Sequence, residues 1–253
     1  MAAPQSCTIL TYGNEGETDR RRALVSLLKR SPIPDEELLS NLGLFLTPQT
    51  LSRILFMDFL YRQILTVQGI AVEFGCRWGQ NASLFSALRG IYEPFNRLRK
   101  VAAFDTFEGF PSTRPQDGAQ LGPGMYAVTP DYERYLQRVL EFQEQESPLS
   151  HVGKFELVKG DVTHTLPSYL ERNPETIIAL AYFDLDLYEP TLKCLSAIRD
   201  RLTIGSVLGF DELNDHATPG ETLALKEALG LHRVSVRRFP ASARTSYVVI
   251  EAL

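Results

Sequence analysis

The chain has 253 residues, of which 44% are hydrophobic and 23% charged, a composition typical of a globular protein with a full core. The formal net charge of −5 argues against nucleic acid as the main partner, because proteins that bind polyanions usually carry a basic excess. Three cysteines without paired or metal-type spacing, no export signal and no apolar run of about 20 residues predict a cytoplasmic protein with no membrane partner.

Residues 1–46 are predicted to form a helical N-terminal extension. Its first helix carries apolar residues at helical spacing and ends before two prolines: Ala23, Leu24, Leu27, Leu28, then Pro32 and Pro34. The arginine run at 20–22 is interpreted as a solvated face, with a patch for a substrate phosphate as the alternative. The extension is a candidate dimer or lid element, or it packs on its own sheet. We expect a homo-oligomer, a dimer or larger.

Residues 47–253 are predicted to form one α/β domain. A helix begins at Thr47 and Pro48, an N-cap followed by proline, and runs to about Val67. Helical patterns then alternate with apolar runs in the order that builds a parallel sheet. The five predicted parallel strands are 70–74, 101–104, 155–158, 177–183 and 205–210. The helix at 81–90 is expected to be followed by a second, short helix that carries Tyr92, Phe95 and Leu98.

The last two apolar runs, 234–239 and 245–251, lie one tight loop apart, which predicts an antiparallel hairpin. The expected fold class is therefore α/β, a Rossmann-like doubly wound seven-stranded sheet of five parallel strands and a terminal antiparallel hairpin. The segment 112–130 is rich in Pro and Gly and is interpreted as a lid or binding loop, with disorder as the alternative. Met125 and Tyr126 are its lid candidates.

Every predicted parallel strand carries an acid at or just past its carboxyl end. The acids are Glu73, Asp105, Asp161, Asp184 with Asp186, and Asp211 with Glu212. In an open α/β sheet these ends line one crevice, so acids that are far apart in the chain converge in space. Like charges repel and their burial is unfavourable, so the concentration of carboxylates indicates a site that receives cations or hydrogen-bond donors.

The turn after the first strand, Glu73-x-Gly75-x-x-x-Gly79, lacks the full dinucleotide pattern Gly-x-Gly-x-x-Gly. It is interpreted as a turn that lets the backbone approach a ligand, with a purely structural tight turn as the alternative. Asp105 is placed to accept from two ribose hydroxyls, or it is an N-cap for the next segment of the chain. Trp78 packs against a cofactor or closes the core, and the core is favoured.

Several runs in residues 48–253 resemble the class I S-adenosylmethionine-dependent methyltransferases. More closely, they look like the macrocin-type (TylF-like) sugar O-methyltransferases of antibiotic biosynthesis, a family that also acts on a rhamnose for calicheamicin. The runs are Val-Glu-Phe-Gly at 72–75 with Trp-Gly at 78–79, Ala-Phe-Asp-Thr-Phe-Glu-Gly-Phe-Pro at 103–111, Lys-Gly-Asp-Val at 159–162, Tyr-Phe-Asp-Leu-Asp-Leu-Tyr-Glu-Pro-Thr at 182–191, and Phe-Asp-Glu at 210–212.

The resemblance implies a cofactor site and a metal site. The cofactor, S-adenosylmethionine, would be held at the methionine part by Glu73, Gly75 and Gly79, at the ribose by Asp105 with Thr106 and Phe107 beside it, and at the adenine by Asp161 and Val162, with Asp184 also near the cofactor. Relatives bind a divalent ion, usually Mg²⁺, through carboxylates that match Asp184, Asp186, Asp211 and Glu212. Many relatives have Asp-Asp where this chain has Asp211-Glu212.

The expected activity is methyl transfer to a hydroxyl of a small acceptor, predicted to be a sugar or a sugar-containing natural product. Mg²⁺ would stabilise the developing alkoxide and Asp186 would take the proton as general base, unless it caps the next helix. His216 is a second catalytic candidate, with a solvated loop histidine as the alternative. A phenolic acceptor is the alternative substrate. The alternative functions are a non-catalytic cofactor-binding protein and a nucleotide-sugar oxidoreductase.

Overall fold

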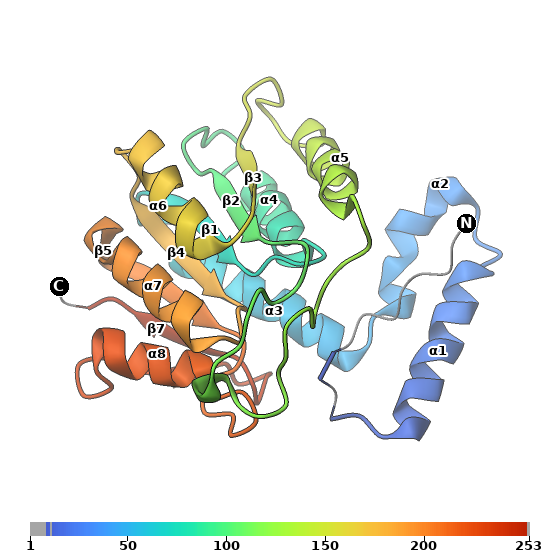
Figure 1. Ribbon diagram of the computed structural model, residues 1–253. Coiled ribbons are helices and arrows are strands. Elements are labelled where there is room, and N and C mark those ends of the chain that lie inside the picture. The colour runs from blue at the N-terminus through green and yellow to red at the C-terminus, as the bar shows by residue number, and fades with distance from the viewer. Residues whose placement is uncertain (1–8, 11, 252–253) are drawn as a thin grey trace.

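A seven-stranded sheet forms the middle of the computed structural model, which describes residues 9–10 and 12–251 (Figure 1). The strands lie in the order β3-β2-β1-β4-β5-β7-β6. They are β1 (Ile70–Phe74), β2 (Val101–Asp105), β3 (Phe155–Lys159), β4 (Ile178–Phe183), β5 (Leu202–Phe210), β6 (Arg237–Arg238) and β7 (Ser246–Val249). Strands β1 to β5 pair in parallel, and β7 pairs antiparallel with both β5 and β6. The predicted fold class is confirmed.

Helices cover both faces of the sheet (Figure 1). One face carries α3 (Pro48–Gln63), α4 (Gln80–Tyr92) and α5 (Tyr132–Gln145), and the other carries α6 (Val162–Arg172), α7 (Tyr188–Ile198) and α8 (Gly220–Leu229). Short 3₁₀ turns lie at η2 (Pro115–Asp117) and η3 (Arg199–Arg201). Since β1 and β4 have helices on both sides, every residue of these two strands is buried. The site therefore sits on a rigid base.

The N-terminal extension stands apart from the sheet in Figure 1. It contains α1 (Glu15–Lys29), α2 (Asp35–Leu38) and the 3₁₀ helix η1 (Leu39–Phe45). Asn14 caps α1 by accepting a hydrogen bond from the N–H of Glu17, and no residue of α1 is buried. None of the helices that the structure describes is long and apolar enough to cross a membrane.

Three local expectations are corrected. The short helix predicted around 92–98 is absent: α4 ends at Tyr92, and turns follow up to Lys100. The helix expected to reach Val67 ends at Gln63. The predicted strand 234–239 pairs only at Arg237 and Arg238, both of which are exposed, because an edge strand gains little from burial.

Candidate active site

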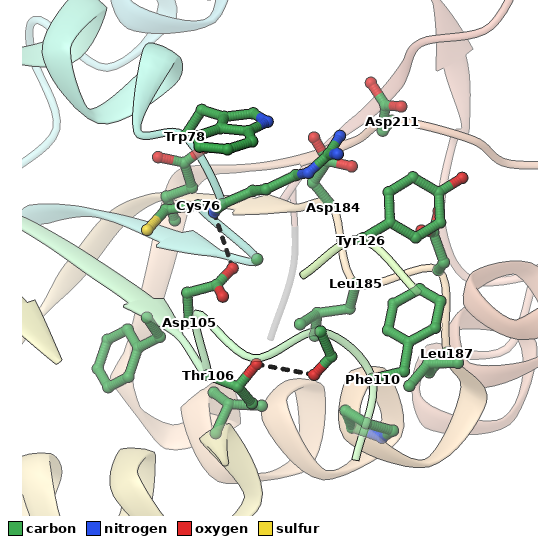
Figure 2. Close-up of a pocket in the computed structure, with 18 of the residues that line it drawn as sticks. Cys76, Trp78, Asp105, Thr106, Phe110, Tyr126, Asp184, Leu185, Leu187 and Asp211 are labelled. Carbon is green, nitrogen blue, oxygen red and sulfur yellow. Dashed lines mark hydrogen bonds between the residues drawn. The ribbon is translucent and has the colours of Figure 1, made fainter. Parts of the chain in front are cut away.

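One cavity of about 370 Å³ opens at the carboxyl ends of the parallel strands. Figure 2 shows Asp105 on one side of it, and Asp184 and Asp211 on another. Of the residues predicted for the site, those that line the cavity are Glu73, Gly75, Asp105, Thr106, Asp161, Val162, Asp184, Asp186 and Asp211. The crevice expected from the parallel topology thus brings acids from four strand ends and one helix N-terminus into one space.

Glu73, the fourth residue of β1, is buried and only half satisfied. Asn81 donates to its Oε1 at 2.8 Å, whereas Oε2 is buried without a hydrogen-bond partner. Burial, aided by the charges of Asp184 and Asp105, raises the pKa of Glu73 to about 8 against the opposing hydrogen bond from Asn81. A buried orphan oxygen at the cavity wall fits a cationic or donor group of a ligand, such as the ammonium of the S-adenosylmethionine methionine part.

Asp105 is the last residue of β2, and its carboxylate connects the turn after β1 to the turn after β2 through hydrogen bonds. Its carboxylate accepts the N–H of Arg77 at 2.7 Å and the N–H of Phe107 at 2.6 Å. Burial raises the pKa of Asp105, although these two N–H groups oppose the shift. The alternative of an N-cap holds for the turn alone, because Asp105 accepts the N–H of Phe107 and the next helical segment begins only at Pro115. The carboxylate keeps accepting capacity on both oxygens, which suits the two hydroxyls of a ribose.

The residues next to Asp105 take different positions. The hydroxyl of Thr106 lines the cavity and donates to the carbonyl of Gly109 at 2.8 Å. Phe107 is buried among the core residues and does not line the cavity. Asp161 lines the cavity and also caps α6, because it accepts the N–H of Thr163 at 2.8 Å. Val162 follows as the first residue of that helix.

Gly75 and Gly79 both adopt positive φ, of 86° and 74°. A Cβ at Gly75 would lie 2.0 Å from the carbonyl oxygen of Asp184, and one at Gly79 would lie 2.3 Å from the side chain of Leu136. Glycine is therefore needed at both positions for two reasons within the protein itself: the space for a Cβ is already filled, and the backbone adopts a positive φ. Gly75 lines the cavity and Gly79 does not, so the role of Gly79 toward a cofactor stays a prediction.

Arg53 lies between Asp184 and Asp211, two acids at the carboxyl ends of neighbouring strands. Its guanidinium donates to Asp184 at 3.0 Å and to Asp211 at 2.6 Å, and the hydroxyl of Tyr182 also donates to Asp211 at 3.0 Å. Despite Arg53, burial and the neighbouring charge of Asp211 raise the pKa of Asp184. The acids thus carry more negative charge than the arginine offsets.

Asp186 lines the same cavity with a strained backbone at φ 59°. Burial and the charge of Asp211 raise its pKa, whereas Arg244, Arg77 and Arg53 oppose the shift. The alternative that Asp186 caps the next helix is wrong. Asp117, from the long loop, accepts the N–H of Tyr188 at 2.6 Å at the start of α7, and it also accepts the N–H of Arg114 at 2.6 Å.

Glu212 differs from the other three predicted metal ligands. It is fully buried, does not line the cavity and pairs with Arg244. Arg244 also approaches Asp211, with its Nε 3.9 Å from Oδ2. Among residues 9–10 and 12–251, no group of three or more His, Cys, Asp or Glu side chains is arranged to hold a metal ion.

Carboxylate oxygens are the kind of ligand that a hard divalent cation prefers, although Asp184, Asp186 and Asp211 are not arranged here as a metal site. Asp184, Asp186 and Asp211 offer carboxylate oxygens at one side of the cavity, and the raised pKa of Asp184 and Asp186 marks a shortage of positive charge there. Arg53 occupies part of the space between the acids. A metal ion would therefore share the acids with Arg53 or replace it.

The outer rim of the cavity comes from segments distant in sequence. The guanidinium of Arg77 lies 5.6 Å from the centre of the Trp78 ring and 5.1 Å from that of Tyr126. The hydroxyl of Tyr126 accepts the N–H of Leu10 at 3.3 Å, and Leu10 itself lines the cavity. Arg77 and Tyr126 have positive φ, of 46° and 62°, so strained residues gather at this rim.

Four sequence-predicted candidates that are not acids have clear positions. Trp78 is 39% exposed and lines the cavity, so the favoured assignment to the core is wrong. Its indole rests edge-on against Tyr132. The side chain of His216 is 97% exposed and is not among the lining residues, so its catalytic role stays a prediction. Tyr126 reaches the cavity, whereas Met125 does not.

The polar residues that line the cavity but were not predicted for the site include Arg53, Arg77, Asn81 and Arg244, and Glu221 lies outside the lining. Glu221, at the start of α8, accepts the N–H of Leu185 at 2.9 Å and is fully buried. Its second oxygen has no partner, and burial raises its pKa well above the usual value. The sequence pattern that could have indicated Arg53 as a site residue is a charged residue on an otherwise apolar helix face. That pattern does not identify the acids with which the arginine pairs.

Two solved structures of CalS11 are similar to the chain over almost its whole length. One, described as a calicheamicin methyltransferase, is 44% identical over 98% of this chain and 98% of that chain, with a TM-score of 0.91. The other, the apo structure described as a TDP-rhamnose 3'-O-methyltransferase of calicheamicin biosynthesis, is 43% identical over 95% of this chain and 96% of that chain, with a TM-score of 0.84.

The O-methyltransferase NovP is a more distant structural neighbour. It is 16% identical over 79% of this chain and 80% of that chain, with a TM-score of 0.62, which shows a shared fold. No family model matches the chain, and no curated protein does. The likeness to CalS11 covers the N-terminal extension as well as the sheet.

Proposed function

The chain belongs to the S-adenosylmethionine-dependent O-methyltransferases of the TylF-like kind, the family of CalS11, and from this premise we propose that it methylates a hydroxyl of a nucleotide-linked sugar. The observation that carries the proposal is the shared cavity. It joins Glu73 and Asp105, which suit the cofactor, to Asp184 and Asp186, which suit an acceptor hydroxyl. A cofactor and an acceptor bound there would be held against each other, as methyl transfer requires.

On the cofactor side, Glu73 would accept from the ammonium group through its orphan Oε2, and Asp105 would accept from the ribose hydroxyls. Asp161 and Val162 would border the adenine. S-adenosylmethionine supplies a sulfonium methyl, whose carbon–sulfur bond breaks as the acceptor oxygen bonds to that carbon, leaving the electron pair on sulfur. The protein's own part is to exclude water and align the groups.

On the acceptor side, Asp186 is the proposed general base, which takes the hydroxyl proton on its carboxylate. A carboxylate whose pKa is raised toward neutrality is a stronger base than an ordinary aspartate and still ionises near physiological pH. Arg77 and Arg244 also line the cavity, and their guanidiniums suit the phosphates of a nucleotide-linked sugar. CalS11 is described as acting on TDP-rhamnose, an acceptor of this kind.

Mg²⁺ belongs to the proposal as an auxiliary. Asp184, Asp186 and Asp211 would hold it, with Glu212 behind them. Bound there, the ion would stabilise negative charge on the acceptor oxygen. A cytoplasmic location is likewise a prediction.

An acceptor screen with methyl-labelled S-adenosylmethionine tests the proposal. The acceptors are TDP-rhamnose, a simple rhamnoside and a catechol, each with added Mg²⁺ and with a chelator. We expect label in TDP-rhamnose above the other two, with loss of transfer in chelator. Transfer to the catechol alone would overturn the sugar assignment. Tight cofactor binding with no transfer to any hydroxyl would show a non-catalytic protein.

A further inference from the structure

The base segment, defined here as residues 184–187 between β4 and α7, carries Asp186 in an unfavourable backbone conformation. Asp186 has a φ of 59°, in the left-handed region that residues other than glycine adopt infrequently. A conformation of this kind persists where neighbouring contacts hold it. The groups that hold the base segment therefore determine where the carboxylate of Asp186 points.

The first turn of α8 lies directly against the base segment. A Cβ at Gly220 would lie 2.5 Å from the carbonyl oxygen of Asp186 and 2.6 Å from the backbone nitrogen of Tyr188, so glycine is needed for this approach. Helices α7 and α8 pack side by side (Figure 1), which keeps the first turn of α8 in place. The backbone of Asp186 is thus in contact with a helix that follows β5 in the chain.

Glu221, the second residue of α8, accepts a hydrogen bond from the base segment. Its Oε1 accepts the N–H of Leu185, the residue before Asp186, at 2.9 Å. On the other side of Asp186, the N–H of Tyr188 donates to Asp117 at 2.6 Å. Both acceptor side chains are buried. Two buried carboxyl groups therefore hold the chain on either side of the strained residue.

The position of Glu221 is electrostatically unfavourable. The side chain is fully buried, and its Oε2 has no hydrogen-bond partner in the described part of the chain. The charges of Asp186, Asp184 and Asp211 all act on it. A buried carboxyl group with an unsatisfied oxygen beside three other acids is destabilising. Stability alone would favour an apolar residue or an amide here, so the carboxyl group fits a role in the reaction better than a role in the fold.

The helix N-terminus does not explain the orientation of Glu221. An acid in the first turn of a helix interacts favourably with the helix dipole, but an exposed acid does so equally well. The side chain of Glu221 instead reaches away from α8 to the N–H of Leu185. Its contact therefore serves the base segment.

We propose that Glu221 is a positioning residue, which fixes the backbone N–H of Leu185 and thereby aims the carboxylate of Asp186 at the acceptor hydroxyl. The inference rests on the proposed function, because it takes Asp186 as the base. Glu221 does not line the cavity, so it reaches the reaction only through the base segment. A displacement of the base by about 1 Å is enough to lower the rate about 100-fold.

Two variants separate the hydrogen bond of Glu221 from its charge. E221D keeps the carboxyl group on a side chain one methylene shorter, so its oxygen no longer reaches the N–H of Leu185. E221Q keeps the length and the accepting oxygen without the charge. We expect E221D to lower kcat about 10- to 100-fold and to leave the KM for S-adenosylmethionine within about twofold, because Glu73 and Asp105 lie on other strands. E221Q should lower kcat by no more than about threefold, since a neutral acceptor is weaker than a charged one.

T222V is the matched control on the same helix. The hydroxyl of Thr222 accepts the N–H of Asn214 at 2.8 Å, a contact of the same kind that reaches a different loop. The kcat of T222V should equal that of the wild type. Thermal midpoints of the three variants should stay within about 5 °C of the wild type, and kcat is expressed per folded molecule. A loss of kcat in E221Q as large as that in E221D, or an E221D chain that does not fold, overturns the proposal.

A double-mutant cycle with D186N shows through which residue Glu221 acts. In the D186N background, E221D should change kcat by less than about twofold, since the base that Glu221 aligns is already absent. An equal loss of kcat in both backgrounds, or wild-type kcat in E221D, overturns the proposal.

Crystal structures of the wild type, E221D and E221Q separate this inference from the proposed function. We expect Asp186 to leave the left-handed region in E221D and to keep it in E221Q, whatever the acceptor is. An unchanged φ at Asp186 in E221D overturns the positioning role. Wild-type kcat in D186N, together with a displaced Asp186 in E221D, would instead show that Glu221 holds the base segment but that the proposed function has the wrong base.

Discussion

Strands β1 and β2 carry buried ionic groups at both ends, and the two ends are built differently. At their amino ends, the guanidinium of Arg99 donates to the carbonyls of Ile64 and Val67 at 2.9 and 2.8 Å and pairs with Glu93 at 2.9 Å. Glu93 also accepts from Tyr61 and Asn96. Burial opposes ionisation of Glu93, but the hydrogen bonds from Arg99, Asn96 and Tyr61 outweigh it and lower its pKa.

At the carboxyl ends of the same strands, Glu73 keeps an orphan oxygen and the pKa values of Glu73 and Asp105 are raised. Further along the sheet the same holds for Asp184 and Asp186. A satisfied ionic group stabilises the fold, whereas a group left short of partners is destabilising until a ligand supplies them. The carboxyl ends of the strands are therefore shaped for ligands and the amino ends for stability.

The largest expected difference between the carboxyl and amino ends of the strands is the loss of catalysis when Asp186, at the carboxyl ends, is replaced. Asp186→Asn should lower kcat by about 10²- to 10⁴-fold, because the base is lost. The thermal midpoint should stay the same or rise, since a buried charge is removed. Label transfer and thermal unfolding measure the two quantities. A variant with normal kcat would remove Asp186 from the mechanism.

The second-largest expected effect is that Glu73 makes the stability of the ligand-free protein depend on pH. Its pKa is 4.5 in the unfolded chain and about 8 in the folded, ligand-free protein, so the folded state binds more protons between these values. Stability of the ligand-free protein should therefore fall as pH rises from 4.5 to 8, by up to about 5 kcal/mol. Urea unfolding at a series of pH values measures it. Glu73→Gln should flatten the slope, and an identical slope in that variant would show that another group is responsible.

At the amino ends, Glu93→Gln should destabilise the fold by about 3 kcal/mol, because it leaves the buried guanidinium of Arg99 without its counter-charge. Urea unfolding measures the loss. The kcat per folded molecule should not change. A large loss of kcat without a loss of stability would contradict the division between the two ends.

The smallest expected effect concerns Arg53. If its guanidinium competes with a divalent ion for Asp184 and Asp211, Arg53→Met should raise the affinity for Mn²⁺, a probe for Mg²⁺, by about tenfold. Electron paramagnetic resonance of free Mn²⁺ measures binding without turnover. Arg62→Met, an exposed change on the same helix, is the control. Unchanged or weaker binding in Arg53→Met would show that the arginine and the ion do not compete.

The sequence predicted the sheet and the acids because both depend on local patterns. An apolar run that ends in a carboxylate identifies a strand and its carboxyl end together, as at Glu73 and Asp184. Arg53 and Arg244 escaped prediction because they reach Asp211 from α3 and from the segment before β7, and only the tertiary fold brings them together.

The hydrogen bond from the N–H of Tyr188 to Asp117 limits how this enzyme can be re-engineered. The loop 112–130 is an obvious segment to exchange in order to change the acceptor, because it supplies Tyr126 to the cavity. It also supplies the side chain that binds the first N–H of α7, two residues after Asp186. A graft that lacks an acid at position 117 would uncap that helix beside the base. Loop exchange between relatives should therefore transfer Asp117 and Tyr126 together.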